Sequence, residues 1–179
     1  MDIKCSVYIA ASVDGFIAKP GGDIKWLQRP EYATSGMKGL VYDDFISTVD
    51  ALVMGRSTFE VALSFSNWPY ENIPAVVLST THPTVPHHLQ RKVRIESGTP
   101  EQIVSLLASE GKRHLYIDGG VTIQRFLKAR LIQEITITWI PILLGEGVPL
   151  FGVIGIEQPL RLIEAVSSDN GFVQVRYQV

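Results

Sequence analysis

The sequence predicts an α/β domain built on a mostly parallel central sheet with an antiparallel C-terminal hairpin. Short apolar runs rich in valine and isoleucine alternate with helix-like stretches along most of the chain, a pattern typical of right-handed crossovers between parallel strands. Near the C-terminus, Asn170-Gly171 separates two strand-like runs, which favours a hairpin. The length of 179 residues fits one domain.

Strands are expected wherever a short apolar run is bounded by polar or turn-forming residues. The expected strands cover residues 4–12, 51–54, 75–78, 93–95, 114–117, 134–141, 160–165 and 172–177. The segments 13–28 and 82–89 are punctuated by glycine or proline and are expected to be loops.

Four helices are expected between these strands. The first is placed within residues 31–48, with 40–48 favoured because Gly36 and Gly39 weaken the earlier part. The second opens at 55–58 and runs to about Leu63. Thr99 and Gln102 form a capping box around a proline, which predicts a helix that ends near residue 111. The last covers residues 122–129.

Composition and charge argue against several classes of protein. A net charge of −2 disfavours a broad nucleic-acid-binding surface. No apolar run reaches the roughly 18–20 residues of a membrane helix, and the first residues lack the layout of a signal peptide. Cys5 is the single cysteine, so no internal disulfide can form, which fits a cytoplasmic protein. No metal site is expected, because His82, His87 and His88 gather only in a proline-containing loop.

Polar or glycine-rich turns follow three of the expected strands. They are Gly55-Arg56-Ser57-Thr58, Ser79-Thr80-Thr81 and Asp118-Gly119-Gly120. If the strands are parallel neighbours, the three turns share the edge of the sheet where such folds bind ligands. Glycines allow a ligand to approach the backbone, and free N–H groups at a helix start favour a phosphate. Each turn taken alone also fits an ordinary surface loop, and the G-x-G-x-x-G and Walker motifs are absent.

Five segments resemble the dihydrofolate reductase fold. They read A-A-S-V-D-G-F-I-A at 10–18, D-A-L-V-M-G-R-S-T-F-E at 50–60, A-V-V-L-S-T at 75–80, D-G-G-V-T at 118–122 and I-P-I-L-L-G-E-G at 140–147. Their order and spacing are most similar to the C-terminal reductase domain of the bifunctional riboflavin-biosynthesis deaminase-reductase and its stand-alone relatives. The resemblance covers nearly the whole chain and implies one domain, residues 1–179, with a three-layer dihydrofolate reductase-like fold.

The same resemblance implies hydride transfer from NADPH. It places Ala10, Ala11 and Ile17 around the nicotinamide. The residues that it implies for the rest of the cofactor are Gly55, Arg56, Ser57, Thr58, Leu78, Ser79, Thr80, Gly119, Gly120, Val121 and Thr122. The implied substrate is a small pterin-like or ribosylamino-pyrimidine heterocycle, as for 5-amino-6-(5-phosphoribosylamino)uracil reductase.

The chain departs from dihydrofolate reductases at the carboxylate that those enzymes carry on their first helix. An ungapped count back from Met54 places Gly39 there, so Asp43 and Asp44 are the catalytic candidates, although adjacent aspartates on a helix are usually solvated. The zinc-deaminase motif is also missing, since one cysteine cannot supply it. An authentic dihydrofolate reductase and a non-catalytic NADPH-binding protein therefore stay open as alternatives.

Three further expectations concern the substrate, the assembly and the backbone. Tyr8, Trp26, Gln28, Tyr42 and Phe45 are the candidates for substrate contact. The apolar segment 134–145 exceeds what one small sheet requires, and resembling proteins are commonly dimers, so a homodimer through this region is expected. The resemblance also implies one non-proline cis peptide bond within residues 118–120.

Overall fold

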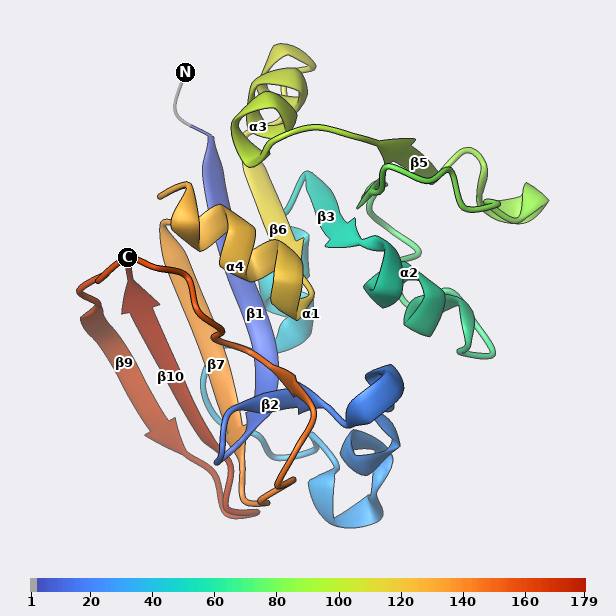
Figure 1. Ribbon diagram of the computed structural model, residues 1–179. Helices are drawn as coiled ribbons and strands as arrows, with labels where there is room; N and C mark the ends of the chain where they lie inside the picture. The colour runs from blue at the N-terminus through green and yellow to red at the C-terminus, as the bar shows by residue number, and fades with distance from the viewer. Residues whose placement is uncertain (1–2) are drawn as a thin grey trace.

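The computed structural model describes residues 3–179 and is organised around an eight-stranded sheet (Figure 1). The strand order is β5-β4-β3-β6-β1-β7-β10-β9. The strands are β1 Lys4–Ser12, β3 Ala51–Gly55, β4 Ala75–Leu78, β5 Val93–Glu96, β6 His114–Asp118, β7 Glu134–Ile140, β9 Arg161–Ser167 and β10 Val173–Gln178. All neighbours from β5 to β7 pair in parallel, and β10 and β9 add the antiparallel edge. The predicted sheet and hairpin are confirmed.

Four α-helices connect the strands. They are α1 Tyr42–Ser47, α2 Arg56–Leu63, α3 Pro100–Ser109 and α4 Gly120–Lys128. The capping box of α3 is present, with the Thr99 side chain accepting from the Gln102 N–H. The first helix is shorter than 31–48, because Gly36 and Gly39 take φ values of 82° and 100° that no right-handed helix contains. No helix in the part of the chain that the structure describes has the length and hydropathy of a membrane span.

The expected loop at 13–28 contains structure that the sequence patterns missed. Strand β2, Phe16–Ala18, pairs with β8, Val148–Pro149, in a small two-stranded ribbon. Three short 3₁₀ turns, Pro20–Gly22, Lys25–Gln28 and Pro30–Tyr32, complete this stretch. A fourth 3₁₀ turn, His87–Leu89, lies in the second expected loop. Segments of two to four residues carry too little periodicity to be distinguished from loop.

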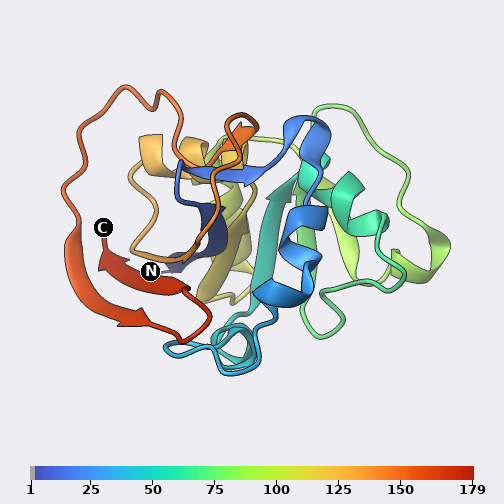
Figure 2. The ribbon, with the colours of Figure 1, turned by 90° about the horizontal axis from the view of Figure 1, so that it is seen from below.

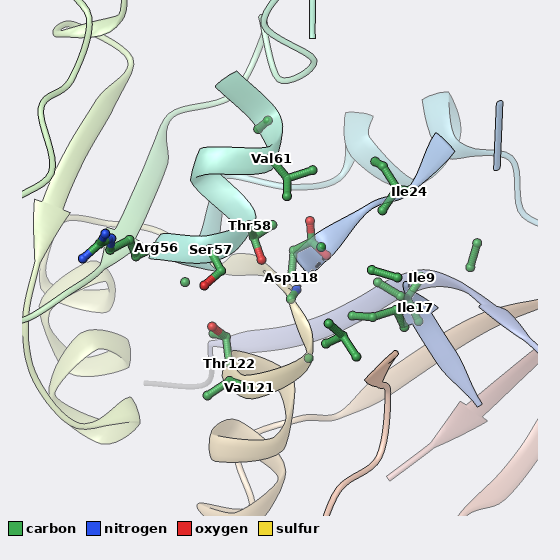
Figure 3. A pocket seen from close by; sticks show the side chains of 18 of the residues that line it. Ile9, Ile17, Ile24, Arg56, Ser57, Thr58, Val61, Asp118, Val121 and Thr122 are labelled. Atoms are coloured by element: carbon green, nitrogen blue, oxygen red, sulfur yellow. Dashed lines mark hydrogen bonds between the residues drawn. The ribbon is translucent and has the colours of Figure 1, made fainter. Parts of the chain in front are cut away.

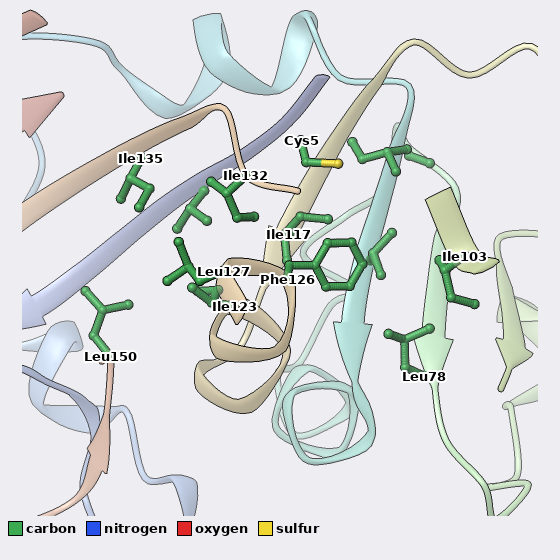
Figure 4. Packing of buried hydrophobic residues seen from close by; sticks show 14 of the residues in the cluster. Cys5, Leu78, Ile103, Ile117, Ile123, Phe126, Leu127, Ile132, Ile135 and Leu150 are labelled. Carbon is green, nitrogen blue, oxygen red and sulfur yellow. The ribbon is translucent and has the colours of Figure 1, made fainter. Parts of the chain in front are cut away.

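Helices cover both faces of the sheet, so the fold has three layers (Figure 2). Side chains of β3 show the arrangement, because they alternate between the faces. Ala51 and Val53 belong to the cluster that α3 and α4 complete, and Leu52 and Met54 belong to the cluster of α1 and α2. Figure 4 shows the first cluster, in which Phe126 of α4 is fully buried. Both faces of the central strands β3, β4 and β6 are covered, which explains their continuous apolar runs.

The parallel register brings the carboxyl ends of three strands to one edge. Gly55 of β3 lies opposite Leu78 of β4, and Met54 lies opposite Asp118 of β6. The turns at 55–58, 79–81 and 118–120 therefore meet at this edge, as the sequence predicts. The position of β7 bears on the expected dimer, which stays a prediction. The apolar side chains of β7 itself are explained by burial between β1 and β10 within one chain, whereas Leu143 of the following segment is exposed.

Candidate functional site

A cavity of about 590 Å³ opens at the carboxyl edge of the parallel strands (Figure 3). This volume is in the range of pockets that bind small molecules and cofactors. The turns that begin α2 and α4 form one end, and the residues there are Gly55, Arg56, Ser57, Thr58, Leu78, Gly119, Gly120, Val121, Thr122 and Arg125. The other end is formed by β1, the 3₁₀ turns and α2, and its residues include Tyr8, Ile9, Ile24, Leu27, Tyr42, Val61, Ala62, Phe65, Tyr70 and Tyr116.

The two glycine turns lie against each other. A Cβ atom added to Gly55 would stand 2.9 Å from the Thr122 hydroxyl, and one added to Gly119 would overlap the Thr58 hydroxyl. Gly119 also has a φ of 90°, which disfavours any other residue. The close approach leaves the first turns of α2 and α4 side by side at the cavity. Their free N–H groups and helix dipoles therefore favour an anionic ligand at this end.

Arg56 lines the cavity and is held beside the end of β4. Its Nε donates to Glu60 Oε1 at 2.6 Å, and a terminal nitrogen donates to the Thr81 hydroxyl at 3.0 Å. Half of the side chain is exposed. Ser79 and Thr80 do not line the cavity, although Leu78 does, and Ser79 hydrogen-bonds to Thr81. Thr81, the third residue of the Ser-Thr-Thr turn, therefore bonds to Arg56, although it was not among the predicted site residues.

Asp118 lies between the two ends of the cavity and is the carboxylate that lines it (Figure 3). Its side chain is 7% exposed. One carboxyl oxygen accepts from the Gly119 N–H at 2.8 Å, and the other accepts from the Tyr70 hydroxyl at 3.0 Å. Burial raises the pKa of Asp118, and the two hydrogen bonds offset part of that rise. The sequence pattern marks Asp118 only as a turn residue, so this buried acid was not predicted.

Four tyrosines surround the apolar end of the cavity. The hydroxyl of Tyr8 donates to the Leu40 carbonyl, that of Tyr116 donates to the Tyr8 carbonyl, and that of Tyr70 donates to Asp118. Tyr42 also lines the cavity, and within residues 3–179 its hydroxyl has no hydrogen-bond partner. Burial raises the pKa of Tyr42, and the nearby Asp118 carboxyl adds to the rise, so the phenol keeps its proton.

Several candidates from the sequence lie away from the cavity. Trp26 is buried with Ile140 and Phe172 in a separate cluster. Phe45 is in the core, where its ring stacks on Tyr8 with the ring centroids 4.9 Å apart. Gln28, Asp43 and Asp44 are exposed, and Ala11 is fully buried in the core. None of these six lines the cavity, whereas Tyr8, Ala10, Ile17 and Tyr42 do. The reason is packing, since aromatic side chains near a strand end suit a core as well as a pocket.

The prediction of a cis peptide bond within residues 118–120 is wrong for this structure. Both peptide bonds within residues 118–120 are trans, as are all others in the described chain. The positive φ of Gly119 reverses the chain direction at this point. The N–H of Ile123 then bonds to the Gly119 carbonyl, which starts α4 directly after the turn.

The β2–β8 ribbon lies along the edge of the cavity and contributes Ile17 and Val148 to its lining. The Asp14 carboxylate accepts from the N–H groups of Leu144 and Gly145 at 3.1 and 2.7 Å. The N–H of Leu150 bonds to the Gly15 carbonyl at 2.9 Å. These bonds join the segment after β1 to the segment after β7, so two distant parts of the sequence form one side of the site.

The three-layer α/β fold, with a cavity at the carboxyl edge of its parallel strands, is shared with a dihydrofolate reductase of known structure, so the fold is dihydrofolate reductase-like. The model of the RibD C-terminal domain matches residues 4–174. The chain belongs to this family, whose members resemble the reductases of riboflavin biosynthesis.

Individual relatives agree with this family. The chain is 40% identical to a putative riboflavin biosynthesis protein from Shewanella sp. PV-4, covering 98% of both chains with a TM-score of 0.87. It is 35% identical to the uncharacterized protein YwjB of Bacillus subtilis, covering 90% of each. A dihydrofolate reductase from Enterococcus faecalis, solved with NADP(H), shares the fold with a TM-score of 0.63 and 16% identity over 98% of this chain and 95% of that one.

Proposed function

We propose that this protein is an NADPH-dependent reductase that adds a hydride and a proton across a C=N or C=O bond of a small heterocycle. The observation that carries the proposal is one continuous cavity. It runs from two helix N-termini suited to phosphates, past a buried carboxyl group, to an apolar end lined by tyrosines. The reductase family of the chain supports the reaction type.

The residues at the helix end fit a dinucleotide with several phosphates. Gly55, Gly119 and Gly120 line this end without a side chain, and Ser57 and Thr122 add hydroxyl groups. Arg56, beside Thr81, provides the positive charge for a 2′-phosphate. Ala10 and Ile17 also line the cavity and would hold the nicotinamide. When bound, NADPH supplies the hydride. The related fold of the Enterococcus faecalis enzyme, solved with NADP(H), supports this cofactor.

Asp118 is the proton source in this proposal. Its raised pKa keeps a larger fraction of the carboxyl group protonated than at an exposed aspartate. The carboxyl proton moves to the nitrogen or oxygen of the reduced bond while the hydride goes to the carbon. Water then returns a proton to Asp118. Tyr70 holds the carboxyl group in place through its hydroxyl, at 3.0 Å. The apolar walls exclude water, which strengthens these interactions.

The two alternatives from the sequence have less support. A dihydrofolate reductase that uses Asp43 or Asp44 requires one of these groups in the cavity, and both are exposed on α1. A non-catalytic NADPH-binding protein has no use for a buried acid beside the nicotinamide end of the cavity. It remains a distinct outcome of the experiment, namely cofactor binding without turnover.

The experiment measures NADPH binding by fluorescence and NADPH oxidation with a panel of pterins and aminopyrimidines. We expect micromolar or tighter binding, and oxidation with at least one compound. Asp118→Asn should keep the binding and lose most of the oxidation, while Asp43→Asn, an exposed control, should leave both unchanged. Absence of NADPH binding would refute the proposed function. Oxidation that is unaffected by Asp118→Asn would refute the assigned proton source.

A further inference from the structure

Positive charge is confined to one end of the cavity. Arg56 and Arg125 line the end where α2 and α4 begin. Arg125 also donates to the Gly98 carbonyl at 3.1 Å, which holds it on that side. Figure 3 shows Arg56 at the opposite side of the cavity from Ile9, Ile17 and Ile24, with Asp118 between them. Both arginines are therefore placed for the cofactor rather than for a substrate.

The substrate end of the cavity contains no cationic side chain among the described residues. Its lining consists of aliphatic and aromatic groups from β1, the 3₁₀ turns and α2. Lys19 and Lys25 lie on the neighbouring loop, but neither lines the cavity. The charge that this end can carry is that of Asp118, which is negative when ionised.

The polar groups open to a substrate are correspondingly few. Three of the four tyrosine hydroxyls donate their protons within the protein, to Leu40, Tyr8 and Asp118. Among the described side chains of the lining, the Tyr42 hydroxyl has no hydrogen-bond partner, and the Asp118 oxygens keep lone pairs beyond the bonds from Gly119 and Tyr70. Two such groups suit the edge of a neutral ring, where a hydroxyl and a carboxyl can each bond to one ring nitrogen or carbonyl.

A phosphate group would be unfavourable at this end. Moving a doubly charged anion into an apolar site is strongly unfavourable unless cations or several N–H groups compensate its charge. The nearby Asp118 would add repulsion in its ionised form. The substrate of the riboflavin-pathway reductase that the sequence resembles carries such a phosphate, and the residues needed to hold it are not in the described lining.

We infer that the substrate of this protein is a neutral, phosphate-free heterocycle whose C=N or C=O bond is reduced, rather than a phosphoribosyl compound. The inference rests on the proposed function. The reaction balances as hydride from NADPH to carbon and proton from Asp118 to nitrogen or oxygen, which leaves NADP⁺ and a carboxylate that water reprotonates. Tyr42 and Asp118 orient the ring, and Ile24, Leu27 and Phe65 enclose it.

The test compares matched compounds that differ only in phosphate. One pair of probes is 5-amino-6-ribosylaminouracil and its 5′-phosphate. The other pair is 6-hydroxymethylpterin and its diphosphate. Binding to the NADP⁺-loaded protein is measured by calorimetry, and reduction is measured by NADPH oxidation. We expect the phosphate-free member of each pair to bind at least tenfold more tightly. Equal or tighter binding of a phosphorylated member in either pair would overturn the inference.

A charge introduced at the substrate end gives a second, independent readout. Ile24→Lys places an ammonium beside the ring position, and Ile24→Met is the neutral control of similar length. Ile24→Lys should strengthen the binding of the phosphorylated probes at least tenfold relative to Ile24→Met. If the two variants bind the phosphorylated probes equally well, an added cation brings no gain, which would contradict the absence of a phosphate site in the wild-type protein.

The outcomes also separate the inference from the proposed function. If NADPH binds but no phosphate-free probe binds or is reduced, the substrate inference fails while the cofactor assignment stands. If NADPH itself does not bind, the proposed function fails first.

Discussion

Arg56 gives the most direct test of how the site selects its cofactor. The guanidinium lies beside Thr81 and half of it is exposed. A charge-assisted hydrogen bond contributes about 1.5–3 kcal/mol, or roughly ten- to a hundredfold in affinity. Glu60 already pairs with Arg56 at 2.6 Å, and solvent screens an exposed pair, so the lower end applies. We therefore expect Arg56→Ala to weaken NADPH binding about tenfold and to leave NADH binding nearly unchanged.

The assay titrates each cofactor into wild-type and variant protein and follows nicotinamide fluorescence at two salt concentrations. Glu60→Gln is the matched variant, because it releases the guanidinium from its i,i+4 partner. It should raise NADPH affinity about twofold, which corresponds to the ~0.3–0.5 kcal/mol of such a pair. A preference for NADPH that is stronger at low salt would agree with a contact to the 2′-phosphate. Equal losses for NADPH and NADH in Arg56→Ala would refute this role.

Three further predictions address catalysis, stability and assembly. Asp118→Asn should lower kcat about a hundredfold or more. Wild-type activity should fall as the pH rises through the elevated pKa of Asp118, because the ionised carboxyl group cannot donate a proton. A wild-type pH–rate profile without that fall would contradict the role of Asp118. Phe126→Ala should lower the free energy of unfolding by about 3–5 kcal/mol in urea titrations, since Phe126 is fully buried, whereas the half-exposed Phe151→Ala should cost much less. Leu162 is 54% exposed on the edge strand β9, next to other exposed apolar residues. We therefore expect a homodimer through this edge, and Leu162→Glu should dissociate it. Sedimentation that shows a monomeric wild-type protein at micromolar concentration would exclude this dimer.

The fold could be predicted from the sequence because each central strand is a short apolar run that ends in a distinctive turn. β3, β4 and β6 were placed within one residue of their observed bounds for this reason. The ribbon of β2 and β8 could not be predicted, because it exists through tertiary contacts. The bond from the Leu150 N–H to the Gly15 carbonyl joins residues far apart in the chain.

The glycine turns at one end of the cavity were also predictable, whereas the residues that line its other end were not. The cues at Gly55 and Gly119 are local, since glycine at a strand end indicates close backbone contact. Selecting Tyr42 over Phe45 or Trp26 requires knowledge of which ring faces the cavity. That orientation is set by packing of α1 and the 3₁₀ turns on the sheet. The same limit applies to Asp118, whose burial and Tyr70 partner come from distant segments.

The bonds of Asp14 determine how the site can open. Ile17 and Val148 line the same cavity from segments that the Asp14 carboxylate and the Gly15–Leu150 bond tie together. Neither segment can move away from the site without breaking these shared bonds, so the two should open as a single cooperative unit. Amide hydrogens in residues 15–18 and 144–150 should then exchange with solvent at a common rate. Asp14→Ala should raise that rate in both segments, including the one it does not belong to.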